Sequence, residues 1–155
     1  MRNRLTVVAY GIPGPQGSKR HVGRGVMVES SKKVKPWRED VRQATIAAMA
    51  EHPEWSPDSR HLVMHATFTL ARPTSHYRTG RFSHLLRENA PAAPDVKPDL
   101  DKLLRSTCDA LTSAGAYADD SRVVVIHARK VYPTTDRRLW GALDRPGACI
   151  TLEAA

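Results

Sequence analysis

Residues 97–123 read KPDLDKLLRSTCDALTSAGAYADDSRV, and they decide the fold more than any other part of the sequence. Apolar and small side chains recur here at three- and four-residue steps, namely Leu100, Leu103, Leu104, Thr107 and Leu111. This spacing predicts an amphipathic helix, and Gly115 supplies its stop signal. The β-branched run from Arg122 to Tyr132 predicts a strand soon afterwards.

The rest of the chain predicts one more helix and further strands. Apolar residues at helical spacing predict a helix from Lys33 to about Glu51, and alternation from His61 to Ala71 predicts a strand with one core face. Further strands are expected at Leu5–Ile12, Met27–Glu29 and Ala148–Leu152. With 155 residues, the chain is long enough for one core. We therefore expect a single α/β (α+β) domain over residues 1–155, with a mixed sheet of four to five strands packed by two main helices.

The charge of the chain points to a polyanionic partner. The formal net charge is +8, and contacts to phosphates release counterions, so nucleic acid is the leading candidate. Cys108 and Cys149 are isolated and have no metal-type spacing, which favours reduced, buried thiols. The apolar part of the N-terminus is too short for a signal peptide, and no segment is long enough to span a membrane. We expect a cytoplasmic protein.

Acidic residues gather in one part of this basic sequence. Of the 16 acidic residues, five fall within 22 positions: Asp99, Asp101, Asp109, Asp119 and Asp120. Asp99 and Asp101 open the predicted helix, where carboxylates cap exposed N–H groups and interact with the helix dipole. Helix capping is therefore the first interpretation of this pair. The second is a catalytic metal site.

A metal site requires the carboxylates to converge. Pro98 disfavours helix in the residue before it, so Asp99 and Asp101 can face one point at the helix start. An antiparallel return of the chain would bring Asp119 and Asp120 back beside them. Carboxylate oxygens suit magnesium or manganese, and such an ion can activate water for phosphodiester hydrolysis. Arg105, one turn beyond Asp101, would bind the scissile phosphate or form a surface ion pair.

Basic side chains are concentrated in other segments. Residues 72–96 form a proline-punctuated, basic segment without periodicity, and we expect it to be a flexible loop. Together with residues near the first strand and the second helix, it would contact phosphates. Tyr77 and Phe82 would stack on bases or fold back onto the domain. The expected DNA contacts are Lys19, Arg20, Arg72, His76, Tyr77, Arg78, Arg81, Lys97 and Lys102.

The stretch 97–123 resembles the central motif of the RusA family of Holliday-junction resolvases, particularly its phage and prophage branch. The resemblance rests on the Asp-Leu-Asp pair, the Asp-Ala-Leu-Thr helix end and the paired Asp before a strand. Gly-Ile-Pro-Gly-Pro near the N-terminus, Lys-Pro-Trp of the first helix and Arg-Pro-Thr-Ser-His-Tyr extend it over most of the chain. It implies a homodimer that makes paired, magnesium-dependent nicks in four-way junctions, with Asp99, Asp101 and Asp120 as catalytic metal ligands.

Two positions depart from the family pattern. Arg105 stands where the family has a lysine important for cleavage, and Lys102 stands where it usually has asparagine. Arginine keeps the charge, so binding of a phosphate is the role that Arg105 most easily retains. Two alternatives remain open at this point. One is a DNA-binding protein without catalysis, and the other is a nuclease for flaps or forks that uses the same residues.

Overall fold

The computed structural model describes residues 3–17, 20–21, 23, 27–28, 32–57 and 61–154. Its main feature is a four-stranded mixed sheet with the order β1-β6-β4-β5. The strands are β1 (Arg4–Tyr10), β4 (Leu62–Thr69), β5 (Val123–Val131) and β6 (Gly147–Ala154). β6 lies antiparallel to both β1 and β4, whereas β4 and β5 are parallel. The predicted mixed sheet is confirmed.

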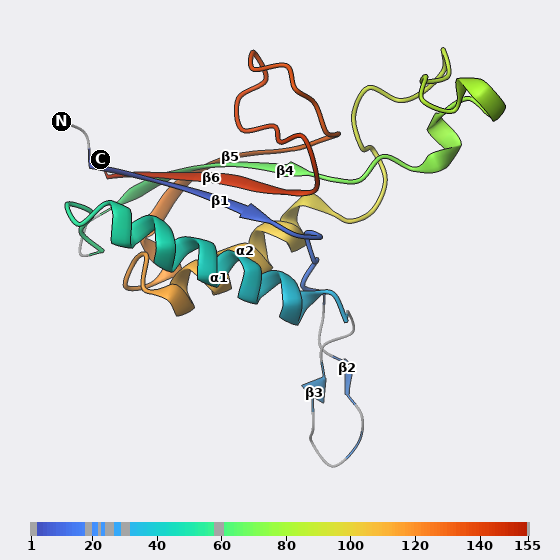
Figure 1. The fold of residues 1–155 in the computed structure, drawn as a ribbon. Coiled ribbons are helices and arrows are strands. Elements are labelled where there is room, and N and C mark those ends of the chain that lie inside the picture. The colour runs from blue at the N-terminus through green and yellow to red at the C-terminus, as the bar shows by residue number, and fades with distance from the viewer. Residues whose placement is uncertain are drawn as a thin grey trace.

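Both main helices cover one face of the sheet (Figure 1). They are α1 (Val34–Glu51) and α2 (Leu100–Ala114), close to the predicted bounds. Parallel strands need a crossover connection, and α2 provides it between β4 and β5. Gly115 ends α2 with a φ of 80°, in the left-handed conformation that glycine adopts without steric cost. None of the described helices is long and apolar enough to cross a membrane.

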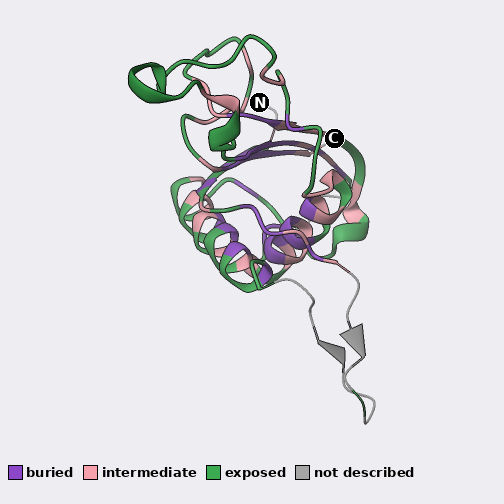
Figure 2. Ribbon diagram, turned by 90° about the vertical axis from the view of Figure 1, so that its right-hand side faces the viewer, coloured by how far each residue is buried: buried purple, intermediate pink, exposed green. Residues whose placement is uncertain are grey.

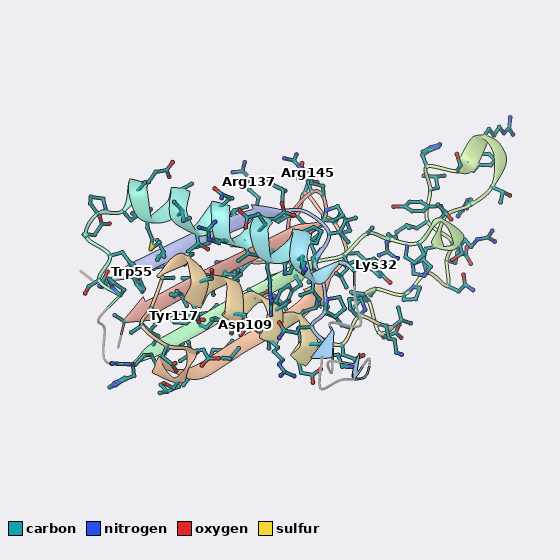
Figure 3. All side chains as sticks on the ribbon, turned by 90° about the horizontal axis from the view of Figure 1, so that it is seen from below. Lys32, Trp55, Asp109, Tyr117, Arg137 and Arg145 are labelled. Atoms are coloured by element: carbon teal, nitrogen blue, oxygen red, sulfur yellow. The ribbon has the colours of Figure 1, made fainter. Side chains whose placement is uncertain are left out.

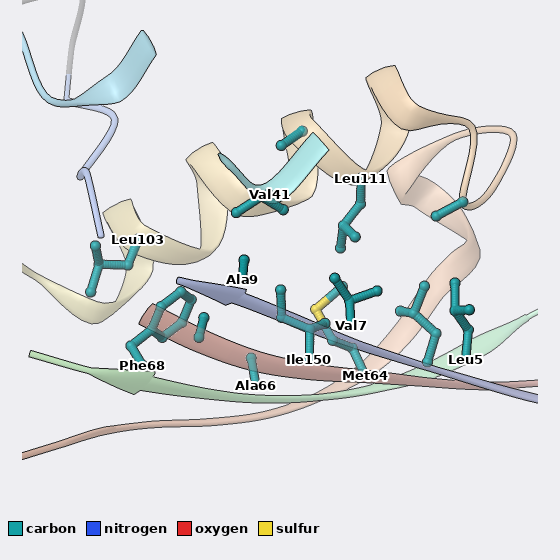
Figure 4. Packing of buried hydrophobic residues seen from close by; sticks show 14 of the residues in the cluster. Leu5, Val7, Ala9, Val41, Met64, Ala66, Phe68, Leu103, Leu111 and Ile150 are labelled. Atoms are coloured by element: carbon teal, nitrogen blue, oxygen red, sulfur yellow. The ribbon is translucent and has the colours of Figure 1, made fainter. Parts of the chain in front are cut away.

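The core lies between this face of the sheet and the two helices (Figure 4). Period-2 alternation directs Leu5 and Val7 of β1 and Met64 of β4 into it, and all three are fully buried. Trp37 of α1 is fully buried as well, and its Nε1 donates a hydrogen bond to Thr107 Oγ1 at 3.2 Å. Trp37 is therefore a core residue that ties the two helices together.

The opposite face of the sheet is partly covered by residues 133–146, which cross above β4 and β6 (Figure 1). Thr67 and Thr69 point to this face, yet both are fully buried. Leu143 N–H donates to Thr69 Oγ1 at 3.0 Å, and Thr67 Oγ1 donates to the Trp140 carbonyl at 3.1 Å. The expectation of a single core face for β4 is therefore incomplete, because a distant loop covers part of its polar side.

Two smaller elements complete the described chain. β2 (Arg20–His21) pairs with β3 (Met27–Val28), which places the expected short strand in a two-stranded ribbon. Residues 72–96 project from the sheet as a largely exposed arm (Figures 1 and 2). The arm contains 3-10 turns at Thr74–His76 and Gly80–Phe82 and a β-bridge between Tyr77 and Leu86. It therefore has more local structure than its sequence predicts.

Candidate functional site

A cleft of about 790 Å³ opens where the chain leaves β4 and β5 and enters the two helices. Its walls come from segments that are far apart in the sequence, so the cleft exists only in the folded chain. The lining residues are Ile12, Pro13, Pro15, Lys32, Lys33, Leu70, Ala71, Pro73, Pro94, Val96, Lys97, Pro98, Asp99, Lys102, Tyr132 and Pro146.

The charges that line this cleft are mostly positive. Lys32 and Lys33 enter from the start of α1, and Lys97 and Lys102 enter from the start of α2. Among the described lining residues, Asp99 is the only acid. A concave surface lined by one sign of charge focuses the electric field and attracts polyanions. The cleft is thus suited to a phosphate chain that approaches Asp99.

Asp99 is the N-cap residue of α2, but its carboxylate does not cap the helix. The residue has extended backbone angles, with φ −70° and ψ 138°, and its side chain accepts no capping hydrogen bond. Instead, Asp99 Oδ2 lies 3.1 Å from Lys102 Nζ, with both side chains about half exposed. Side-chain capping therefore does not account for Asp99.

Lys130 of β5 fixes the segment that leads into α2. Its Nζ donates hydrogen bonds to the carbonyl oxygens of Val96 at 2.7 Å and Pro98 at 3.0 Å. Hydrogen bonds from a charged donor are stronger than neutral ones. The carboxyl end of β5 is in this way joined to the residues immediately before Asp99.

A second contact holds the first turns of α2 from the other side. Gln16 N–H donates to the Lys102 carbonyl at 3.0 Å, and Ser106 Oγ donates to the Gly14 carbonyl at 2.6 Å. A Cβ atom on Gly14 would lie 2.3 Å from the backbone oxygen of Lys33, so only glycine permits this approach. The Gly-Ile-Pro-Gly-Pro segment thus packs the starts of both helices together.

Asp101 and Arg105 lie one turn apart on α2, and both are exposed. Neither forms an ion pair or a side-chain hydrogen bond with another described residue. The interpretation of Arg105 as one half of a surface ion pair is therefore not supported. Its guanidinium is available to an external anion on the side of the helix that carries Asp101.

Asp119 and Asp120 lie beyond the opposite end of α2. Ser121 N–H donates to Asp119 Oδ1 at 2.8 Å, and hydrogen bonds with Ser121 lower the pKa of Asp119. Burial raises the pKa of Cys108 to about 11, with a smaller contribution from the nearby Asp120 carboxylate. Asp120 therefore lies near the second half of α2.

The prediction that Asp119 and Asp120 lie beside the start of α2 is wrong for a single chain. After α2 the chain enters β5, which runs back along the helix. The residues that lie near the start of α2 are therefore those at the C-terminal end of β5. Lys130, rather than Asp120, reaches the segment before Asp99. The separation follows from the order of the elements, with strand β5 running back along the helix.

The donor set suits a hard cation, but one chain does not assemble it. Carboxylate oxygens of Asp99, Asp101 and Asp120 are the ligands that magnesium and manganese prefer. Among the described residues, however, no group of three or more His, Cys, Asp or Glu side chains is placed to hold a metal ion. The three carboxylates therefore suit a metal ion by their chemistry, but a single chain does not bring them close enough together to bind one.

Comparison with known protein families decides the identity of the chain. Residues 11–139 match the model of the family Endodeoxyribonuclease RusA, which covers most of the sequence. The chain belongs to the RusA family. RusA proteins are endodeoxyribonucleases that resolve Holliday junctions, and nucleases of this family are generally metal-dependent. A comparison with curated proteins found no match.

As a RusA-family nuclease the protein acts on DNA, and its exposed arm carries several of the expected contacts. Arg78 and Arg81 are exposed, and Arg81 lies over the Phe82 ring with 4.8 Å from its Cζ atom to the ring centroid. Arg72 is instead half-buried and bound to other residues of the protein. It donates to the Pro91 carbonyl at 2.8 Å and lies 3.9 Å over the Tyr132 ring.

The other candidates differ in their surroundings. The His76 ring packs edge-on against Tyr132 at 5.6 Å, and Tyr77 forms the β-bridge of the arm. Lys97 and Lys102 line the RusA cleft. Lys19 lies outside the described residues, and of Arg20 only the backbone, in β2, is described.

Lys130 is the residue of the RusA site that sequence reasoning missed. It lies near the end of the strand predicted from the β-branched run, in the sequence Lys-Val-Tyr. A lysine at the end of a strand is easily interpreted as a solvent-exposed side chain. Its alternation with Ala128 places it on the helix-facing side of β5, in register with the core residue Phe68. A lysine in phase with Ala128, on the helix-facing side of the strand, was the available signal.

Proposed function

We propose that this RusA-family protein cuts four-way DNA junctions by paired, symmetric, magnesium-dependent nicks. Asp99, Asp101 and Asp120 are the proposed metal ligands. The observation that carries the proposal is the position of Asp99, whose carboxylate opens into a lysine-lined cleft and forms no helix cap. A carboxylate that caps no helix N–H group and lies next to cations that attract phosphate is suited to phosphodiester hydrolysis.

The bound cation would supply an activated water and stabilise the negative charge that develops on the phosphate. The chain's own residues bind and orient the substrate. Lys97 and Lys102 hold the DNA backbone in the cleft, and Arg105 holds the scissile phosphate beside Asp101. Lys130 acts as a positioning residue, since it fixes the segment that presents Asp99 without touching the DNA.

A homodimer is part of the proposal, because one chain leaves Asp120 far from Asp99. β5 is the edge strand of the sheet, and no described strand pairs with its second edge. Its side chains include a large exposed apolar group, with Val124 60%, Val125 41% and Ile126 43% accessible. Long apolar edge strands pair readily with another chain. A second copy of this protein is the occupant we propose.

Antiparallel pairing of two β5 strands would complete the site. If the pair is centred near His127, the Asp120 end of one strand lies beside the Lys130 end of its partner. Lys130 is bonded to the segment before Asp99, so Asp120 of one copy approaches Asp99 and Asp101 of the other. A twofold dimer built in this way has two equivalent centres, which suits symmetric cuts in a junction.

The phage or prophage origin and the bacterial cytoplasm as the place of action stay predictions from the sequence resemblance. A flap or fork nuclease would use the same cleft and acids. These alternatives differ in substrate rather than in residues, so the choice between them requires a comparison of DNA structures.

The test is nicking of labelled DNA by the full-length protein. The substrates are an immobile four-way junction, a flap, a fork and a linear duplex of matched sequence, each with magnesium or with chelator. Asp101→Asn is the inactive variant. We expect paired, magnesium-dependent cuts in the junction, which the variant does not make. Faster cutting of flaps or forks would replace the resolvase assignment, and tight junction binding without cuts would remove the catalytic one.

A further inference from the structure

A small pocket of about 290 Å³ lies on the face of the sheet that the helices leave open. It is lined by His65, Ala66, Thr67, His127, Ala128, Arg129 and Trp140. Its size is at the lower end of ligand pockets, where about 300 Å³ is the usual minimum, so it suits one planar ring system. None of its lining residues takes part in the cleft described above.

Three aromatic rings form the walls of this pocket. His65 of β4 and His127 of β5 are register partners, and their rings stack with centroids 4.9 Å apart and an interplanar angle of 21°. The Trp140 ring stands edge-on to His65 at 5.9 Å and 71°. Trp140 is 38% exposed, and His127 is exposed as well. Within one chain, Trp140 and His127 are therefore the rings that solvent reaches.

The backbone of Trp140 is held firmly in place. Its carbonyl oxygen accepts hydrogen bonds from Thr67 Oγ1 at 3.1 Å and from the Arg129 guanidinium. Arg129 Nε also donates to Thr67 Oγ1 at 3.2 Å, so the three residues form one connected group. Gly141 follows with a φ of 75°, and a Cβ there would lie 2.9 Å from Thr67. The pocket is therefore formed before any ligand arrives.

We propose that this pocket binds an unpaired nucleobase of branched DNA. Aromatic side chains that line an accessible pocket bind bases by stacking, and stacking tolerates any base because each has a π face. Arg129 lines the pocket, and Arg137 and Arg145 extend from the loop that carries Trp140 (Figure 3). Arg145 lies 3.8 Å over the Tyr10 ring on the outer face of the sheet. These cations suit the phosphates that flank a base.

The pocket and the cleft lie within reach of one DNA strand. The loop that carries Trp140 directly follows Tyr132 and ends at Pro146, and both of these residues line the cleft. His127 lies four residues before the end of β5, which corresponds to about 13 Å along the strand. A few unpaired nucleotides span this distance. The inference rests on the proposed function, because it takes DNA opened at a branch as the ligand.

The test compares two junctions in the presence of chelator, so that no cutting occurs. One is fully paired, and the other has two unpaired nucleotides at the branch, one of them 2-aminopurine. We expect the protein to bind the unpaired junction more tightly and to quench its fluorescence by stacking. Trp140→Ala and His127→Ala should each weaken this preference by about 5-fold or more, while binding of the paired junction stays unchanged.

Leu85→Ala is the matched control, since Leu85 is exposed and lines neither the pocket nor the cleft. Phe82→Ala tests the exposed aromatic ring of the arm as a competing stacking surface. Loss of the preference in Phe82→Ala alone would overturn the proposal. A shift of Trp140→Ala from dimer to monomer on gel filtration would also overturn it, because Trp140 lies outside the proposed β5 pairing and its surface would then belong to a second copy. A single-stranded 2-aminopurine oligonucleotide separates the two proposals. Quenching that depends on Trp140 supports the pocket even if junctions are never cut.

Discussion

The Asp99 carboxylate lies 3.1 Å from the Lys102 ammonium at the start of α2. The pair places one proposed metal ligand and one proposed phosphate contact on the same turn, at the edge of the cleft. The two side chains are about half exposed, so solvent screens the pair and it adds little to stability. We expect the Asp99–Lys102 pair to affect DNA binding more than the stability of the fold.

Lys102→Gln tests whether this lysine contacts phosphate. Each phosphate contact contributes roughly 0.9 to the slope of log affinity against log salt concentration. We expect the slope for junction binding in chelator to fall by about that amount in the variant. Lys35→Gln is the control, because Lys35 is exposed on α1 outside the cleft. Equal slopes for both variants and the natural protein would remove Lys102 from the DNA interface.

Lys130→Met tests the proposed positioning role. The variant keeps the apolar stem but removes the donor to the Val96 and Pro98 carbonyls. We expect the free energy of unfolding to fall by roughly 1–3 kcal/mol in urea titrations. We also expect half-maximal nicking to require more magnesium. An unchanged magnesium requirement would reduce Lys130 to a structural residue, and Lys35→Met provides the surface control.

Arg105 is tested by a pair of substitutions. Arg105→Lys restores the family residue and keeps the charge, so single-turnover nicking should remain within a few-fold of the natural rate. Arg105→Met removes the charge, and we expect a loss of about 100-fold, typical of one donor to a developing negative charge. Equal activity of the two variants would exclude a phosphate-binding role.

The thiol of Cys108 provides a prediction on pH. Burial raises its pKa from 9.0 to about 11, so the folded state favours the protonated thiol. The stability linked to this group is fully present below pH 9 and is lost as the pH rises towards about 11. In a Cys149→Ser variant, alkylation of Cys108 followed by mass spectrometry should be very slow at pH 8 without denaturant. Rapid alkylation there would contradict the buried environment.

The elements of the fold follow from local patterns in the sequence. Alternation in β4 and three- to four-residue spacing in α2 are set by backbone geometry, so their bounds are predicted within one or two residues. The burial of Thr67 and Thr69 is different. It depends on residues 133–146 folding across the sheet, and no periodicity within β4 contains that information.

The candidate site is predictable in composition but not in arrangement. The acids are visible as a cluster in the sequence, and the resemblance around Asp99 and Asp101 identifies the family that the comparison confirms. Proximity in sequence does not place Asp120 beside Asp99, because α2 separates them by its own length. The Asp99–Lys102 pair and the Lys130 contacts depend on tertiary packing and become visible only in the folded chain.

The central claim is that Asp99, Asp101 and Asp120 serve one metal centre, assembled from two copies of the chain. The most direct test mixes Asp101→Asn with Asp120→Asn, each inactive alone, after unfolding and refolding together. Random pairing gives heterodimers with one intact and one doubly altered centre, so junction nicking should return to about a quarter of the natural level. No recovery above the separate variants would contradict a centre shared between two copies.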